Sequence, residues 1–164
     1  MVDPAEQLRA RGMRVTAPRL AVLRAVTSCP HSTAEAVLAD VRACIGTVSR
    51  QAVYDTLARL TEGGLIRRIQ PGGQPAIYDP RVGDNHHHVV CRACGAASDV
   101  DCVVGRVPCL DAPDTDYRVE EAEIIHWGTC PDCLRGAGGG GGTSRPRRSR
   151  AQTGPTSSIA GDES

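Results

Sequence analysis

Imidazole and thiol side chains, which bind transition metals, are concentrated in one short stretch of the chain, residues 84–95. In an extended strand, side chains point to opposite faces with a period of two, so His86 and His88 are expected on one face and His87 on the other. Cys91 and Cys94 follow with the two-residue spacing of a zinc knuckle. The stretch therefore predicts one strand that supplies two metal sites.

Cys130 and Cys133 repeat the two-residue spacing and are the candidates for the other two ligands of the thiolate site. Four thiolates form a closed tetrahedral set, which is typical of structural rather than catalytic zinc. The sequence shows neither a secretory signal nor a membrane-spanning apolar run, so we expect a cytoplasmic protein without a membrane partner. In that reducing compartment, paired cysteines favour metal binding over disulfides, and free buried thiols are the competing interpretation.

The imidazole site needs ligands beyond His86 and His88. Imidazoles combined with carboxylates suit Fe(II), Mn(II) or Zn(II). From the residues alone, His31 beside Pro30 is better interpreted as a helix-start or surface histidine, although as a ligand it would tie the two halves of the chain together. The nearby carboxylates are Asp79, Asp84, Asp99 and Asp101.

The first half of the chain has the pattern of a winged helix-turn-helix. Apolar residues at helical spacing and capping residues predict four helices, and two short strands follow around a Pro-Gly-Gly turn. The expected helices are residues 4–11, 17–28, a third that begins after Ser32 or Thr33, and 50–61, and the expected strands are 65–69 and 75–79.

The fourth predicted helix is the candidate recognition helix, because polar residues able to donate hydrogen bonds gather at its start. Residues 1–83 carry 11 arginines against 7 acidic residues, whereas residues 84–135 carry 4 against 10, which suggests that only the first half meets a polyanion. The alternative is an ordinary helical surface with solvated arginines. The candidate base-reading residues are Ser49, Arg50, Gln51 and Tyr54, and Arg14, Arg19, Arg67 and Arg68 are candidate phosphate anchors.

The second half changes to the period of strands. We expect strands at residues 86–92, 96–100 and 118–127, with a short helix or turn at 102–110. The resulting expectation is an α+β protein: residues 1–83 as the winged-helix DNA-binding domain with a hinge, residues 84–135 as a metal-binding domain, and residues 136–164 as a disordered Gly/Arg/Ser tail.

Together these motifs resemble the ferric-uptake-regulator (Fur) superfamily of metal-dependent dimeric repressors, across roughly residues 5–135, and look closest to its actinobacterial FurA/CatR peroxide-responsive branch. The carrying motifs are Arg14-Val15-Thr16-Ala17-Pro18-Arg19, Ser49-Arg50-Gln51-Ala52-Val53-Tyr54, Gly64-Leu65-Ile66, His86 through Gly95, and Trp127-Gly128-Thr129-Cys130-Pro131-Asp132-Cys133.

The resemblance implies a fold, two metals and two partners. The N-terminal winged helix is expected to bind an inverted-repeat operator in double-stranded DNA, and the C-terminal α/β domain is expected to form a homodimer. Carried over residue by residue, structural zinc would be bound by Cys91, Cys94, Cys130 and Cys133, and regulatory Fe(II) or Mn(II) by His31, Asp79, His86, His88 and Asp99.

Asp99 indicates which signal the repressor senses. In the superfamily this resemblance implies, peroxide sensors carry Asp at this position, whereas iron-responsive relatives usually carry Glu. The resemblance implies that Fe(II) promotes oxidation of His31 or His86 by hydrogen peroxide, so that DNA is released and catalase-peroxidase and the chain's own gene are expressed. Such self-oxidation is not enzymatic. The alternatives are an iron- or zinc-responsive repressor and a thiol–disulfide switch at Cys102 and Cys109. A zinc hydrolase lacks any supporting motif.

Overall fold

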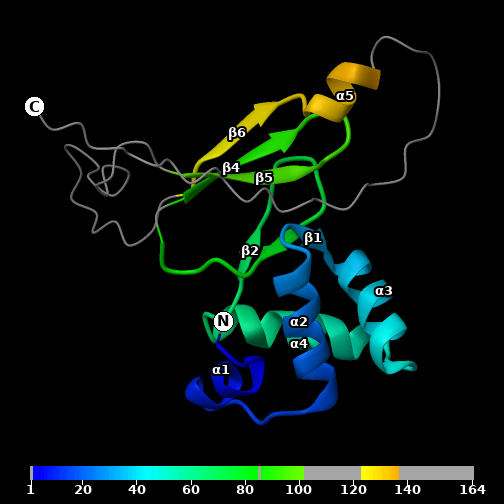
Figure 1. Cartoon of the computed structure of the whole chain (residues 1–164), viewed down its shortest axis with the longest axis vertical. Helices are drawn as coiled ribbons and strands as arrows, with labels where there is room; N and C mark the ends of the chain where they lie inside the picture. Colours follow the sequence, from blue (N-terminus) through cyan, green and yellow to red (C-terminus); the bar gives the residue numbers. More distant parts are fainter. Residues whose placement is uncertain (1, 85, 102–122, 137–164) are drawn as a thin grey trace, which may run out of the picture.

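The computed structural model of the chain describes residues 2–84, 86–101 and 123–136. Figure 1 shows two units, a lower one in which helices gather beside a small sheet and an upper one built on a second sheet. The chain crosses from the lower unit to the upper one between residues 79 and 86.

Four helices form the first unit, and capping residues mark where they begin. The side chains of Asp3, Thr33 and Ser49 each accept a hydrogen bond from a backbone N–H in the first helical turn. Thr16 makes no such bond, and Pro18 in the first turn favours that helix start instead. Within the described ranges, no helix combines the length and apolar character needed to cross a membrane. The helices match the predicted ones to within a residue at each predicted boundary: α1 (Pro4–Ala10), α2 (Ala17–Ser28), α3 (Ala34–Ile45) and α4 (Arg50–Glu62).

The core of this unit is aliphatic, as a chain without Phe requires. Removing a side chain of this size from water stabilises the fold by about 1.5–3 kcal/mol, so the helices are held together mainly by their apolar faces. The side chains that are no more than 1 % exposed include Leu8, Val22, Leu23, Val26, Val37, Val41, Val53, Leu57, Leu60 and Ile66.

A three-stranded sheet borders the helices, in the order β1 (Ser32–Thr33), β3 (Ile77–Asp79), β2 (Arg67–Ile69). Both observed wing strands are two residues shorter than the predicted ones. β2 begins only at Arg67 because the backbone N–H groups of Leu65 and Ile66 still donate to the Leu60 carbonyl at the end of α4. The sequence does not predict β1, which is too short for any periodicity to appear. It forms because it pairs antiparallel with β3.

The second unit is a sheet in the order β5 (Ala97–Asp101), β4 (His86–Cys91), β6 (Ile125–Gly128). The central strand β4 pairs antiparallel with β5 and parallel with β6. Its residues alternate between more and less buried positions, and His86, His88 and Val90 form the buried face. The strand that supplies both groups of candidate ligands is therefore fixed on both edges.

The second unit differs from the expectations in two places. The strand predicted at residues 118–127 is described as β6 only from Ile125, since Glu123 and Ile124 lie outside the strand. A short helix that the sequence does not predict, α5 (Pro131–Gly136), begins inside the second cysteine pair. The expected helix or turn at 102–110 and residues 137–164 of the expected tail lie outside the described residues.

Candidate metal centres and DNA-facing helix

Five predicted ligands converge where the two units meet. Asp79 is the last residue of β3, and His86 and His88 project from one face of β4 because they are two residues apart. Asp99 lies opposite His88 in the pairing of β4 with β5. His31 immediately precedes β1 and so comes from the first unit, 68 residues before Asp99. Both units therefore contribute to one cluster.

The five side chains aim one atom each at a common centre. Oδ2 of Asp79 lies 2.9 Å from Nε2 of His86, 3.3 Å from Nε2 of His88 and 3.9 Å from Nε2 of His31. Oδ1 of Asp99 closes the other side, 2.7 Å from Nε2 of His31. It lies 3.7 and 3.8 Å from the Nε2 atoms of His88 and His86, which are themselves 3.1 Å apart.

These separations fit donor atoms around one divalent cation. At a metal–ligand distance of about 2.1 Å, neighbouring ligand atoms lie about 3.0 Å apart in an octahedron and about 3.4 Å apart in a tetrahedron. The ligand atoms of His31, Asp79, His88 and Asp99 all lie within 4.8 Å of one another. His86 is outside this group of four, yet its Nε2 is close enough to those of its neighbours to share the same centre.

The hydrogen bonds of His86 are compatible with a cation at its Nε2. Its Nδ1 lies 2.6 Å from Oδ1 of Asp84 while its Nε2 lies 2.9 Å from Oδ2 of Asp79. A neutral imidazole carries a single N–H and cannot donate to both carboxylates. A protonated ring donates to both carboxylates, and a metal cation at Nε2 satisfies the contacts equally well. With a cation at Nε2, the Nδ1–H bond to Asp84 fixes the orientation of the ring.

Asp79 remains charged although its side chain is completely buried. Burial raises the pKa of this carboxyl, but hydrogen bonds from His88 and the Arg81 backbone N–H, with the charge of His31, outweigh burial and bring the pKa to about 2. The carboxylate therefore enters the cluster as a negative ligand at neutral pH.

His31 holds its ring in the cluster through an unusual backbone. Its φ of 61° is the only positive value outside glycine among the described residues. That left-handed conformation costs an L-residue about 1–2 kcal/mol. The His31 N–H donates to the Tyr78 carbonyl at 2.8 Å, which anchors the turn to β3.

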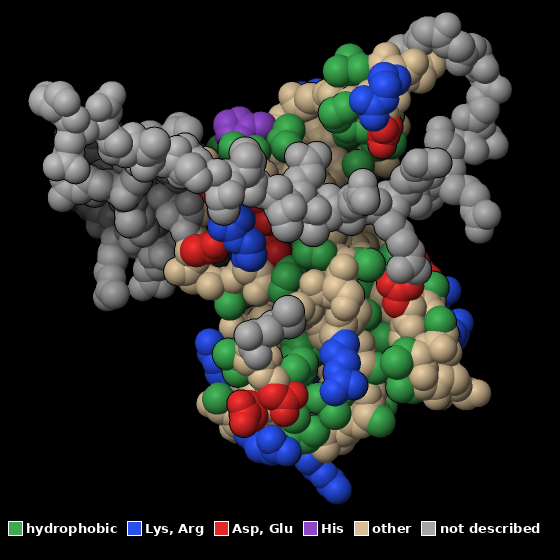
Figure 2. Space-filling model, viewed as in Figure 1, with side chains coloured by type: hydrophobic (Ala, Val, Ile, Leu, Met, Phe, Trp, Pro, Cys, Tyr) green, Lys and Arg blue, Asp and Glu red, His purple; other side chains and the backbone are tan. Residues whose placement is uncertain are grey.

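Arg81 contacts the cluster although the sequence does not single it out. Its backbone N–H donates to Oδ1 of Asp79 at 3.0 Å, and its guanidinium reaches Asp84 at 2.8 Å and both Asp99 and Asp101 at 3.2 Å. Burial lowers the pKa of Arg81, but the three carboxylates outweigh burial and raise it. Figure 2 shows basic and acidic side chains side by side where the two units meet. An arginine two residues after a candidate ligand, in an acidic neighbourhood, is the only signal that could have predicted this contact.

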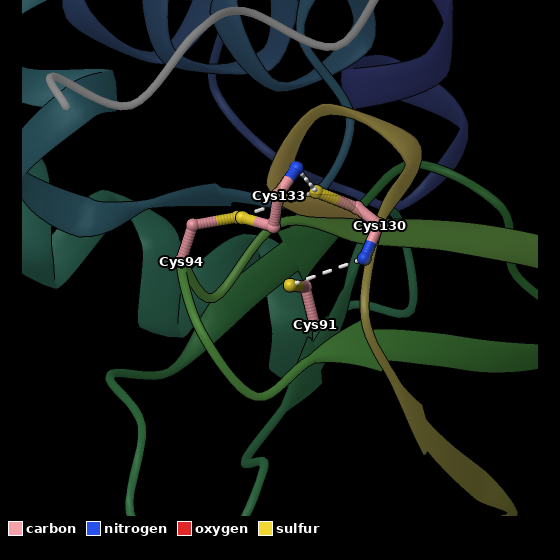
Figure 3. A group of neighbouring side chains, drawn as sticks. All are labelled: Cys91, Cys94, Cys130 and Cys133. Atoms are coloured by element: carbon pink, nitrogen blue, oxygen red, sulfur yellow. Dashed lines mark hydrogen bonds between the residues drawn. The ribbon is translucent and has the colours of Figure 1, made fainter. Parts of the chain in front are cut away.

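The four paired cysteines form a second cluster, drawn in Figure 3. Sγ of Cys94 lies 3.7 Å from Sγ of Cys130, and zinc–sulfur bonds of about 2.3 Å place tetrahedral sulfurs about 3.8 Å apart. The backbone N–H of Cys130 donates to Sγ of Cys91 at 3.3 Å. Gly95 has a φ of 73°, which lets the chain turn sharply after the first pair. The arrangement fits a closed zinc site.

Without a cation, the four sulfurs do not share negative charge equally. Burial raises the pKa of Cys91, but the backbone N–H groups of the surrounding turns outweigh burial and bring it to about 6. Hydrogen bonding to Cys130 raises the pKa of Cys133 to about 12, and burial raises that of Cys94. Four thiolates at these distances repel one another, so a bound cation is needed to deprotonate the whole set.

The predicted DNA-contacting residues of α4 gather at its exposed N-terminal end. Ser49 is the N-cap, and its hydroxyl oxygen already accepts the N–H of Ala52 at 3.1 Å. Gln51 donates to Asp55 at 2.6 Å. Ser49 therefore has a structural task in addition to any DNA contact.

A carboxylate from another helix holds two of these residues. Glu35 of α3 forms an ion pair with Arg50 and accepts the hydroxyl hydrogen of Tyr54 at 2.8 Å. This hydrogen bond raises the pKa of Tyr54. The sequence places Glu35 only in a first helical turn and does not predict the contact, which depends on the crossing of α3 and α4.

Arg14 and Arg19 lie together at the start of α2. A guanidinium N–H of Arg19 donates to the Arg14 carbonyl at 2.7 Å. Figure 2 shows further basic side chains over the helical unit. The two arginines border a hollow of about 310 Å³ lined by Gly12, Met13, Arg14, Arg19, Arg59, Glu62 and Gly63.

The remaining candidates do not join either cluster. His87 points to the opposite face of β4, where its ring lies 6.1 Å from that of His126 on β6. Cys102 and Cys109, the candidate redox pair, lie outside the described residues.

Comparisons with known proteins agree on one family. The model of the ferric uptake regulator family matches residues 10–106. The transcriptional regulator FurA of Mycobacterium tuberculosis is 57 % identical over 132 residues, which cover 80 % of this chain and 90 % of that protein. Ferric uptake regulation protein 1 of Mycolicibacterium fortuitum is 54 % identical over 127 residues, covering 77 % of this chain and 79 % of that protein.

Two more distant likenesses extend the comparison. The peroxide operon regulator of Bacillus subtilis is 28 % identical over 132 residues, covering 79 % of this chain and 90 % of that protein. The crystal structure of the Vibrio cholerae ferric uptake regulator has a TM-score of 0.65 at 23 % identity and covers 78 % of this chain and all of that one. The structural match shows the predicted fold.

Proposed function

This chain belongs to the ferric uptake regulator family and is a metal-responsive transcriptional regulator, and from that premise we propose that it is a repressor that senses hydrogen peroxide. A regulatory Fe(II) or Mn(II) ion bound by His31, Asp79, His86, His88 and Asp99 is required for DNA binding, and Zn(II) bound by the four paired cysteines maintains the second unit. The protein acts in the cytoplasm, where its operator lies.

The observation that carries the proposal is the origin of the ligands. His31 and Asp79 come from the helical unit with its wing, and His86, His88 and Asp99 come from the second sheet. A cation shared by both groups fixes the orientation of the DNA-facing helix relative to the second unit. Metal occupancy and DNA affinity are then linked, because each favours the same arrangement of the two units.

DNA recognition is assigned to the start of α4 and to the arginines before it. Arg50 and Tyr54 read base edges after leaving Glu35, and Arg14 and Arg19 contact phosphates. Arg50→Gln is expected to weaken operator binding by about 1–3 kcal/mol and relax base preference, while Arg14→Gln weakens binding to all sequences and lowers the salt dependence by about one unit. Exposed Arg24 on α2 supplies the control, Arg24→Gln, and equal losses in all three variants would contradict the assignment.

The domain organisation follows the two sheets. Residues 1–83 are proposed as the DNA-binding domain with its hinge, and residues 84–135 as the metal-binding domain that forms a homodimer on an inverted-repeat operator. Among the described residues, β5 lies at an edge of the second sheet, with Val100 exposed. Sedimentation of the zinc-loaded protein tests the dimer, and a monomer at micromolar concentration contradicts it.

The peroxide response is assigned to a ligand histidine. Fe(II) held by these residues would act as a redox catalyst for O–O cleavage, with no net change in its oxidation state. In the net reaction one oxygen atom of hydrogen peroxide enters a C–H bond of the His31 or His86 imidazole, the other leaves as water, and the ring loses two electrons. The oxidised ring is a poorer ligand, so the two units separate and DNA is released. Because the change is stoichiometric, the protein is not an enzyme.

Mass spectrometry after trypsin tests this step. His31 lies in the peptide 25–42, and His86 lies in the peptide 82–92 together with His87 and His88, so fragmentation is needed to place the added oxygen. The Fe(II) protein is expected to gain one oxygen at His31 or His86, and the Mn(II) protein none. Oxidation confined to cysteines, with intact histidines, would instead support the thiol switch.

A specific similarity favours a second candidate, an iron-responsive repressor. The 54 % identical relative is named a ferric uptake regulation protein. Asp99→Glu separates the two, because it restores the longer carboxylate of iron-responsive relatives. For the peroxide sensor, Asp99→Glu retains Mn(II)-dependent binding to promoter DNA of its own gene but loses release by peroxide. An unchanged peroxide response in this variant removes Asp99 from the sensing mechanism, whereas the absence of peroxide release from the unaltered Fe(II) protein favours the iron-responsive repressor. Chelator-treated protein is the unbound control.

A further inference from the structure

Each carboxylate of the regulatory cluster, that of Asp79 and that of Asp99, has one oxygen that faces the histidines and one that faces away from them. Oδ2 of Asp79 and Oδ1 of Asp99 are the inner atoms, which lie within 3.9 Å of the imidazole nitrogens. The outer atoms, Oδ1 of Asp79 and Oδ2 of Asp99, both accept hydrogen bonds from Arg81. A single residue therefore holds the outer oxygens of both acidic ligands.

The two bonds come from different parts of Arg81. The backbone N–H donates to Asp79 at 3.0 Å, in the manner of an aspartate that caps its own turn. The guanidinium donates to Asp99 at 3.2 Å from across the junction with β5. A substitution of the side chain thus releases Asp99 and leaves the bond to Asp79 in place.

The guanidinium is itself fixed in position. Its Nε–H donates to Asp84 at 2.8 Å, and a second N–H group donates to Asp101 at 3.2 Å. Arginine is suited to this task because its planar fork presents several donors in a rigid geometry, whereas a lysine presents one point charge on a flexible stem. Rotation of Asp99 to bring both oxygens inward would break this arrangement.

We propose that Arg81 is a positioning residue that keeps Asp79 and Asp99 as single-oxygen ligands of the regulatory cation. Three imidazole nitrogens and two carboxylate oxygens would then supply five donor atoms, one fewer than the six that Fe(II) and Mn(II) accommodate among oxygen and nitrogen ligands. A bound ion would therefore have room for one small neutral molecule such as water. This inference rests on the regulatory metal site of the proposed function.

The consequence of losing Arg81 has a definite direction. A freed Asp99 can offer its second oxygen, and a positive charge near the cation is removed at the same time. Both changes favour cation binding, and the first excludes water. Arg81→Gln is therefore expected to bind Mn(II) at least as tightly as the unaltered protein while excluding water from the ion.

Water-proton relaxation with Mn(II) measures this directly, because only water bound to the ion transmits its paramagnetic effect efficiently. The unaltered zinc-loaded protein is expected to show the enhancement of an ion that retains exchangeable water. Arg81→Gln is expected to lose that inner-sphere enhancement with no weakening of the Mn(II) dissociation constant. Arg81→Lys, which keeps a charge and one donor toward Asp99, is expected to retain it in part. Arg24→Gln, at an exposed arginine on α2, is the matched control and is expected to leave both values unchanged.

The outcomes separate the inference from the function on which it rests. Failure of the unaltered protein to bind Mn(II), or binding that His31→Asn does not weaken, contradicts the regulatory site itself. Tight Mn(II) binding with equal relaxation enhancement in the unaltered protein and in Arg81→Gln overturns only the role of Arg81, as does weaker Mn(II) binding in that variant. If Arg81→Gln loses zinc or unfolds, Arg81→Lys decides, and an undiminished enhancement in that folded variant counts against the inference.

Discussion

Replacing His31 by Asn tests the link between metal binding and DNA binding. Its Nε2 lies 2.7 Å from Asp99, and it is the one imidazole that the helical unit contributes to the cluster. Asn is preferred to Ala because it tolerates the left-handed backbone of this position, whose φ is 61°. The backbone turn therefore survives, and the shorter amide side chain cannot reach the cluster.

The expected loss can be bounded. Removing a group that merely orients a metal ligand costs roughly 10–100-fold in affinity, so removing the ligand itself is expected to weaken Mn(II) binding at least about 100-fold. That factor corresponds to about 2.7 kcal/mol. Asp79, His86, His88 and Asp99 remain, so weak binding persists at high Mn(II). By linkage, the cation then raises DNA affinity less than before.

Fluorescence anisotropy of operator DNA, titrated with Mn(II) at constant protein concentration, measures both effects. His31→Asn is expected to shift the Mn(II) midpoint upward and to reduce the maximal DNA affinity. His87→Asn is the control, since His87 lies on the opposite face of β4 against His126. An unshifted midpoint for His31→Asn would refute the idea that the cation joins the two units.

Three further predictions concern stability. Cys94→Ser is expected to abolish zinc binding and unfold the second sheet, because structural zinc contributes about 10–16 kcal/mol, which matches or exceeds the total stability of most domains. Metal analysis and hydrogen exchange measure both effects. Cys44→Ser, at an exposed cysteine, is the control and is expected to change neither. Leu57→Ala, at a fully buried position of α4, is expected to lower the free energy of unfolding by about 2–5 kcal/mol in urea titrations, whereas Leu134→Ala, 64 % exposed, is expected to change it by less than about 0.5 kcal/mol. In zinc-loaded protein to which no Fe(II) or Mn(II) is added, the folded state lowers the pKa of Asp79 from 3.8 to about 2. The Asp79 charge then adds about 2 kcal/mol of stability above pH 4, and this contribution disappears as pH falls toward 2. Asp79→Asn is expected to remove this pH dependence, and an unaltered profile contradicts it.

Local patterns predict the parts of this molecule that depend on local physics. The two-residue cysteine spacing and the alternation of His86 and His88 place both groups of candidate ligands on one strand, because strand periodicity holds in any fold. Capping residues such as Ser49 mark helix starts because they satisfy backbone N–H groups of their own first turn. These features need no knowledge of distant segments.

Contacts between distant elements are what the sequence leaves open. Arg81 meets Asp99 only because β4 and β5 pair in one register, and Glu35 meets Tyr54 only because α3 and α4 cross. Likewise, β1 is two residues long and exists only through its pairing with β3. Each depends on tertiary placement, for which residue spacing along the chain carries no signal. The resemblance assigned His31 to the cluster, whereas local reasoning favoured a surface histidine.

The central position of β4 has a spectroscopic consequence. His88 and Cys91 lie three residues apart on a strand that is hydrogen-bonded along both edges. An extended chain advances about 3.3 Å per residue, so these two ligands are about 10 Å apart along the strand, at a distance set by covalent geometry. A paramagnetic ion such as Co(II), substituted into the thiolate site, is thereby held at a constant distance from the junction. Its magnetic coupling to Mn(II) reports occupancy of the regulatory site without any attached label.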